Sequence, residues 1–119
     1  MAKQVLVIDD DAALRLLYER QLSSSGYEVH TVADGPAGLA AAEATSYDVI
    51  ILDVEMPELD GLQVLHQLRQ IAPGSRILLN SAYDIYRHDF QSWLADGYLV
   101  KSSNIQPLID KLRELVDKV

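Results

Sequence analysis

The sequence contains no cysteine, which excludes a disulfide framework, a thiolate metal site and a thiol nucleophile. No apolar run approaches the roughly 18 residues of a membrane-spanning helix, and no leader-like segment precedes the first strand-like run, so we expect no signal peptide or membrane anchor. Basic residues are few, with ten Lys and Arg against 18 Asp and Glu and a net charge of -8. Because nucleic-acid backbones are bound by Lys/Arg patches, we expect no direct nucleic-acid partner. The chain is therefore expected to be a cytoplasmic protein.

The length of 119 residues is typical of one domain, and 49% hydrophobic residues suffice for one ordinary core. No linker, low-complexity tract or internal repeat interrupts the sequence. We therefore predict a single domain over residues 1–119, with one fold and one site.

Short apolar runs rich in branched residues recur along the chain, each too short for a helix, and predict buried strands. They lie at residues 5–8, 49–52, 77–79 and 98–100. A fifth run, 27–32, alternates with polar residues and is predicted to lie at an edge of the sheet.

Between these runs, apolar residues spaced by three and four predict helices. Such patterns begin at Leu14, with Tyr18 as a further apolar position, and at Ala37, Leu62 and Ile105, and the stretch 83–96 predicts a further helix before the last strand. Gly35 is expected between elements. The alternation of strand and helix predicts a three-layer α/β fold, a parallel sheet with helices on both faces.

Polar residues collect where the predicted strands end. Asp9, Asp10 and Asp11 follow the first strand, and Asp53 ends the third. Ligands of such sheets bind outside the carboxyl ends of the strands. Converging carboxylates repel one another unless a cation lies among them, and carboxylate oxygens suit Mg²⁺. We therefore predict a magnesium site, and we interpret Asp11 as the cap of the next helix.

The fourth strand runs into Ser81, and the fifth ends at Lys101. Asp53 ends an apolar strand, where a carboxylate needs a partner or a function. As a nucleophile it could form an acyl phosphate. Phosphoryl transfer needs positioning and charge stabilisation, which a metal, an ammonium and a hydroxyl supply. Taken alone, Lys101 would be interpreted as a solvated surface lysine and Ser81 as a helix cap or turn hydroxyl, whereas a mere turn cap is the weaker interpretation of Asp53.

Four segments together resemble the receiver domain of bacterial two-component response regulators. They are Val-Leu-Val-Ile-Asp9-Asp10, Asp53-Val-Glu-Met-Pro-Glu-Leu-Asp-Gly61, Ser81-Ala82 and Asp-Gly-Tyr98-Leu-Val-Lys101. The resemblance covers essentially the whole chain. It implies five parallel strands in the flavodoxin-like order 2-1-3-4-5, with five helices.

The resemblance also implies a role for each matching position. It makes Asp53 the phosphoacceptor and lets Lys101 contact the phosphoryl group, with Ser81 and Tyr98 as switch residues. The Mg²⁺ ligands implied are Asp9, Asp10, Asp53 and the backbone carbonyl of Glu55. The implied donor is a sensor histidine kinase or a phosphotransfer protein, and the implied recipient is an output domain or effector protein, with a homodimer left open. No enzymatic activity is expected beyond the domain's own phosphorylation and dephosphorylation.

Three departures from the family pattern stand out. Ser102 replaces the usual proline after the lysine, where the family has a cis peptide, so either strain is retained or the loop is rebuilt. Leu94 stands where a glycine is common, and the stretch from Ser81 to Lys101 is short. Tyr83, two residues after Ser81, and Glu55, two residues after Asp53, occupy positions that influence water attack in this family. We predict that Tyr83→Ala changes the lifetime of the acyl phosphate.

Three other protein classes are alternatives to a receiver domain. A haloacid-dehalogenase-like phosphatase also uses an Asp nucleophile, but this Asp ends the first strand in an Asp-x-Asp-x-Thr/Val motif. Asp9 and Asp11 match the two acids of the motif, whereas Ala13 does not match its last residue. A receiver-like interaction module would use the same fold independently of phosphate. A flavodoxin-like cofactor binder would need a Gly-rich or hydroxyl-rich phosphate loop after the first strand, which the sequence lacks.

Overall fold

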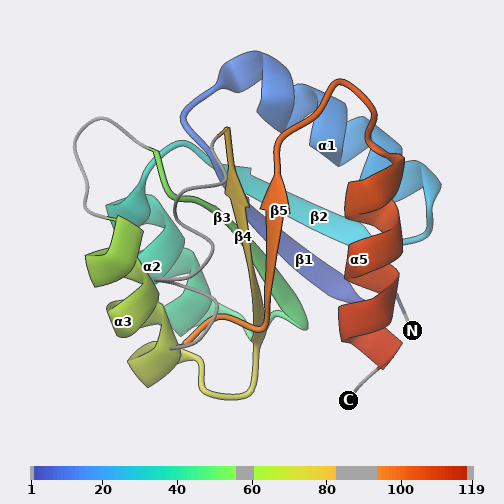
Figure 1. The fold of residues 1–119 in the computed structure, drawn as a ribbon. Helices are drawn as coiled ribbons and strands as arrows, with labels where there is room; N and C mark the ends of the chain where they lie inside the picture. The colour runs from blue at the N-terminus through green and yellow to red at the C-terminus, as the bar shows by residue number, and fades with distance from the viewer. Residues whose placement is uncertain (1, 56–60, 83–93, 118–119) are drawn as a thin grey trace.

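A computed structural model describes residues 2–55, 61–82 and 94–117 of the chain. Five parallel strands form one sheet in the order β2-β1-β3-β4-β5 (Figure 1). This is the order that the family resemblance implies, and the strand predicted at an edge, β2, lies at one. The strands are β1 Gln4–Ile8, β2 Glu28–Val32, β3 Val49–Asp53, β4 Arg76–Ser81 and β5 Gly97–Val100.

The described residues contain four helices rather than the five predicted. They are α1 Ala12–Ser24, α2 Gly35–Ala44, α3 Gly61–Ile71 and α5 Gln106–Asp117. The helix predicted over 83–96 falls mainly on residues outside the described part of the chain. Within the described ranges, no helix is long and apolar enough to cross a membrane.

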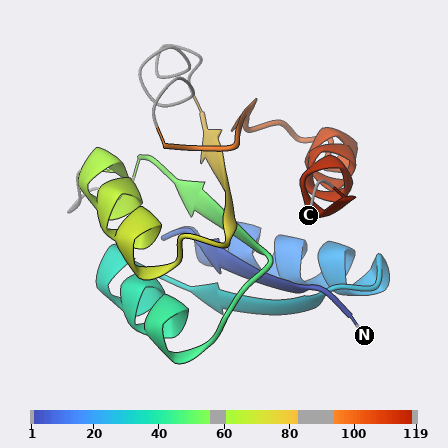
Figure 2. The same cartoon turned by 90° about the horizontal axis from the view of Figure 1, so that it is seen from below.

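Helices cover both faces of the sheet, α1 and α5 on one and α2 with α3 on the other (Figures 1 and 2). Successive strand side chains point to opposite faces, so each strand serves two cores. In β1, Val5 and Val7 pack with α1 and α5, whereas Leu6 and Ile8 pack with α2 and α3. This double burial explains why the central strands are continuous apolar runs.

Local signals fix the helix ends. Asp11 caps α1, as predicted, because its side chain accepts hydrogen bonds from the backbone N–H groups of Ala13 and Leu14. Gly35 was expected between elements, but it is the first residue of α2, because the Asp34 side chain accepts from the Ala37 N–H and sets the helix start there.

Candidate functional site

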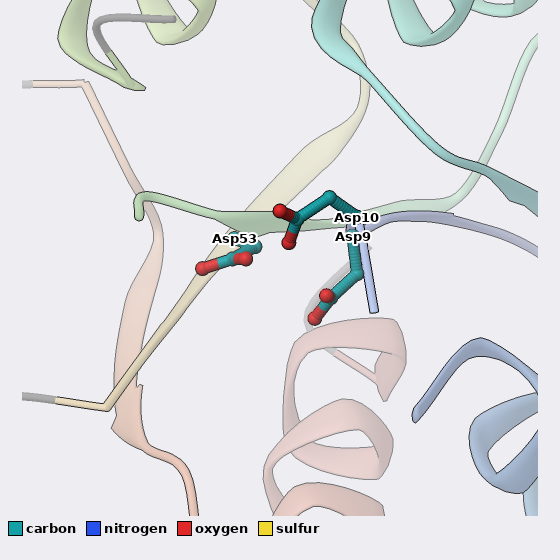
Figure 3. A group of neighbouring side chains, drawn as sticks. All are labelled: Asp9, Asp10 and Asp53. Carbon is teal, nitrogen blue, oxygen red and sulfur yellow. The ribbon is translucent and has the colours of Figure 1, made fainter. Parts of the chain in front are cut away.

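Three carboxylates meet at the carboxyl edge of the sheet. Asp9 and Asp10 follow β1 and Asp53 ends β3 (Figure 3), and the three residues offer oxygens that all lie within 4.8 Å of one another. Asp9 and Asp53 are only 1% and 2% exposed, whereas Asp10 is exposed. The structure therefore brings together the acidic residues that the sequence analysis singled out.

Backbone groups hold the two buried carboxylates in place. Asp9 Oδ1 accepts from the Asp11 N–H at 2.9 Å, and Asp53 Oδ1 accepts from the Glu55 N–H at 3.0 Å. The Arg15 guanidinium donates to the Asp9 carbonyl oxygen at 2.9 Å, which ties α1 to the end of β1. One oxygen of each carboxylate is thus fixed, and the other faces the centre of the cluster.

Lys101 supplies a positive charge at that centre. Its Nζ lies 3.1 Å from Asp9 Oδ2 and 3.3 Å from Asp53 Oδ2. Its backbone N–H donates to the Ser81 carbonyl oxygen at 2.6 Å, which extends the pairing of β4 with β5 by one residue. Burial alone would lower the pKa of Lys101, but the adjacent Asp53 and Asp9 carboxylates raise it above its ordinary value, so the ammonium stays charged.

The charges of the cluster do not balance. Burial raises the pKa of Asp53 above its ordinary value of 3.8, the Glu55 N–H opposes the rise, Asp9 adds to it and Lys101 lowers it. Two buried carboxylates and the exposed Asp10 face one ammonium. The donor set is all oxygen, and the exposed side leaves room for water, so these residues fit a Mg²⁺ ion.

The predicted switch residues lie on neighbouring strands, Ser81 at the end of β4 and Tyr98 in β5. Ser81, fully buried, donates a hydrogen bond to the side-chain carboxylate of Glu55. Tyr98 is 3% exposed and packs inward in the core between the sheet and α2 with α3, together with Leu79. Glu55 was considered for its backbone carbonyl and its position two residues after Asp53, and its contact with Ser81 is an addition from the structure.

The loop after β5 is rebuilt rather than strained. The described residues include no cis peptide bond, so the bond between Lys101 and Ser102 is trans. The Ser102 hydroxyl accepts from the Asn104 N–H at 3.1 Å, and the Asn104 side chain accepts from the Gln106 N–H at 3.0 Å, at the start of α5. Tyr83 lies outside the described residues.

Sequence reasoning missed two polar residues beside the site. Asn80 is the register partner of Asp53, and its side-chain amide donates to the Tyr18 hydroxyl at 2.9 Å. Tyr18 was read as an ordinary apolar position of a helix. The available signal was Asn80 itself, a carboxamide inside an apolar strand.

Comparison with known proteins agrees with this geometry. The model of the response regulator receiver domain matches residues 5–113. The probable transcriptional regulatory protein TcrX of Mycobacterium tuberculosis is 36% identical over 94% of this chain and 49% of its own length. The chain spans about half the length of the curated relatives it matches.

Two solved structures of the response regulator TrrA of Thermotoga maritima are also similar. One, in complex with Mg²⁺-BeF, has a TM-score of 0.88 and 40% identity and covers 95% of this chain and 98% of that chain. The other, in complex with histidine kinase ThkA, has a TM-score of 0.86 and 40% identity and covers 95% and 97%. Fold, site geometry and sequence match together show that this chain belongs to the receiver domain family of two-component response regulators.

Proposed function

We propose that Asp53 accepts a phosphoryl group from a sensor histidine kinase or a phosphotransfer protein. An Asp53 carboxylate oxygen attacks the phosphorus of a phosphohistidine, the P–N bond breaks, and its electron pair leaves with the imidazole nitrogen. The product is an acyl phosphate, which water later hydrolyses to restore the carboxylate and release inorganic phosphate. The observation that carries this proposal is the Lys101 ammonium within 3.3 Å of a nearly fully buried Asp53 oxygen.

The surrounding residues suit this chemistry. Asp9, Asp10, Asp53 and the backbone carbonyl of Glu55 would hold Mg²⁺, which supplies charge neutralisation when bound. The Asp11 and Glu55 N–H groups keep the Asp9 and Asp53 carboxylates oriented, and Lys101 would stabilise negative charge on the transferred group. TrrA, similar to this chain, has been seen with Mg²⁺-BeF, which supports the same use of the site here.

Phosphorylation would be read out through Ser81 and Tyr98. A serine hydroxyl has one proton to donate, so Ser81 must leave Glu55 before it can donate to a phosphoryl oxygen. We propose that this exchange couples Asp53 to the position of Tyr98 at the neighbouring strand. The helix expected over 83–96 would be the fifth helix of the fold and would take part in the response.

An exposed apolar surface beside Lys101 suits a protein donor. Leu16 and Leu17 on α1 are 49% and 40% exposed, and Val100 at the end of β5 is 38% exposed. Leu17, Val100 and Lys101 line one small cavity. The complex of TrrA with histidine kinase ThkA supports a histidine kinase as the partner.

The test is incubation with Mg²⁺ and a small acyl-phosphate donor, followed by intact mass spectrometry. The expected result is one added phosphoryl group on the wild type and none on Asp53→Asn. Asp48→Asn is the matched control, because Asp48 lies at the opposite end of β3 and its carboxylate binds the Gln4 N–H at 2.8 Å. Absence of label on the wild type, or equal label on Asp53→Asn, would refute the assignment.

We further propose that the chain acts as a single domain over residues 1–119 and is no enzyme beyond its own phosphorylation cycle. We also propose that it acts through an output domain or effector protein, with a homodimer as one form in which it does so. The competing function is a receiver-like module that binds partners independently of phosphate. Partner binding that is equal for wild type and Asp53→Asn, with and without the acyl-phosphate donor, would favour it.

A further inference from the structure

A buried polar pair lies directly beside the phosphoacceptor site. Tyr18 on α1 is 5% exposed and Asn80 on β4 is 3% exposed, and the Asn80 amide donates to the Tyr18 hydroxyl at 2.9 Å. The surrounding core is formed by aliphatic side chains of β1, β3, β4 and α5. The net stability from such a buried hydrogen bond is only about 1 kcal/mol, so two apolar side chains would serve the core about equally well.

The sheet register places this pair between Lys101 and its carboxylate partners. Asp53 pairs with Asn80, and Asn80 pairs with Leu99, so the three side chains lie in one row on the face covered by α1 and α5. Lys101 follows β5, which is separated from β3 by β4. Neighbouring strands are about 4.8 Å apart, so the Lys101 side chain must pass over β4 to reach Asp53.

On β4, the Lys101 side chain passes over the position of Asn80. Tyr18, Asn80 and Lys101 line the same small cavity, which shows that the lysine side chain and the polar pair share one space. The Tyr18 hydroxyl belongs to α1 and the Asn80 amide to β4, so their bond also fixes the helix against the strand at this level.

We infer that Tyr18 and Asn80 are positioning residues for Lys101. They form the polar surface across which the lysine side chain reaches Asp53 and Asp9, and they keep its ammonium at 3.1 and 3.3 Å from the two carboxylates. Neither residue has to touch the reacting atoms, because both act through Lys101. The inference rests on the proposed function, in which Lys101 stabilises the transferred phosphoryl group.

The decisive variant is Tyr18→Phe combined with Asn80→Val. Removing both partners leaves no unsatisfied buried polar group, so thermal stability should stay close to that of the wild type. The rate of labelling by a small acyl phosphate with Mg²⁺ should fall by about tenfold. A displacement of about 1 Å at a reacting centre can cost roughly 100-fold, and a smaller displacement of the Lys101 ammonium should cost less. NMR relaxation of the Lys101 Cε methylene should show a more mobile side chain.

Two controls separate positioning from general effects on the fold. Tyr47→Phe also removes a buried tyrosine hydroxyl, which lies 2.7 Å from His30 Nδ1, but it does so at the amino end of β3, and it should keep the wild-type rate. In the Lys101→Met background the double change should slow labelling no further, because residues that act through one group are not additive.

Each outcome has one meaning. If the wild type takes no label, the proposed function fails. If the wild type is labelled and the double variant is labelled at the same rate, with Lys101 equally ordered, the positioning role is wrong. The same holds if the double change slows labelling equally with and without Lys101. Should the double variant not fold, Tyr18→Phe alone carries the test, with a several-fold slower rate expected and an unchanged rate refuting the inference.

Discussion

Replacing Lys101 with methionine tests the electrostatic argument for the site most directly. Methionine keeps a long apolar side chain and removes the charge. The ammonium lies 3.1 Å from Asp9 and 3.3 Å from Asp53, and these carboxylates are almost fully buried. Without it, two or three negative charges remain together with no counter-charge, so the metal-free protein should lose stability at pH 7.

The expected loss is about 3 kcal/mol. At an effective dielectric constant of about 20, each ammonium–carboxylate contact is worth about 5 kcal/mol before desolvation is subtracted. Burial of Lys101 opposes that gain, as its effect on the pKa shows. The loss also has an upper limit, because Asp53 can take up a proton when Lys101 is absent. Holding a carboxyl of ordinary pKa 3.8 neutral at pH 7 costs about 4 kcal/mol. Breaking a buried ion pair typically costs about 3 to 5 kcal/mol.

Urea unfolding without divalent ions, at pH 7 and near pH 5, measures this loss. Removing Lys101 takes away the interaction that lowers the pKa of Asp53, so the folded variant binds protons more readily than the unfolded chain. Its stability deficit should therefore shrink as the pH falls. Lys101→Met combined with Asp53→Asn should recover most of the loss.

Lys111→Met is the matched control for that experiment. Lys111 lies 3.5 Å from Glu114 on α5, and both side chains are partly exposed, so losing this pair should cost well under about 1 kcal/mol. Equal stability of Lys101→Met and Lys111→Met at pH 7 would show that the ammonium does not compensate the buried carboxylates.

Three further predictions concern the metal, the switch and the core. Mg²⁺ at about 100 times its dissociation constant should stabilise the wild type by about 2.7 kcal/mol in thermal or urea unfolding, and Asp9→Asn should lose most of this gain; equal gains would remove Asp9 from the metal site. Glu55→Ala removes the carboxylate to which the Ser81 hydroxyl donates, so half-saturation with beryllofluoride and Mg²⁺, measured by NMR, should need several-fold less ligand, whereas Glu55→Gln keeps an acceptor and should change it less. Gly38→Ala would place a Cβ 2.8 Å from Cγ1 of the fully buried Ile8, so the free energy of unfolding should fall by about 1 to 3 kcal/mol, and an unchanged value would show that α2 can move away from β1.

The sequence by itself determined the described strands and helices and grouped the polar residues of the candidate site. Continuous apolar runs are what a strand buried on both faces requires, and the interrupted run 27–32 placed β2 at an edge. Residues that end parallel strands share one edge of the sheet, so the sequence alone suffices to group Asp9, Asp53, Ser81 and Lys101. The start of α2 was misjudged, because the capping role of Asp34 outweighs the flexibility of Gly35.

Only the tertiary structure decided which of these groups touch. The contact of Lys101 with Asp9 and Asp53 depends on strand order and register across chain separations that leave no periodic signal in the sequence. The same holds for the bond between Tyr18 and Asn80, 62 residues apart, and for that between Glu55 and Ser81. Periodicity follows from local backbone geometry, whereas these distances follow from how the strands lie side by side. For that reason the sequence pointed to Asp53 as the proposed phosphoacceptor, and the fold showed which side chains lie beside it.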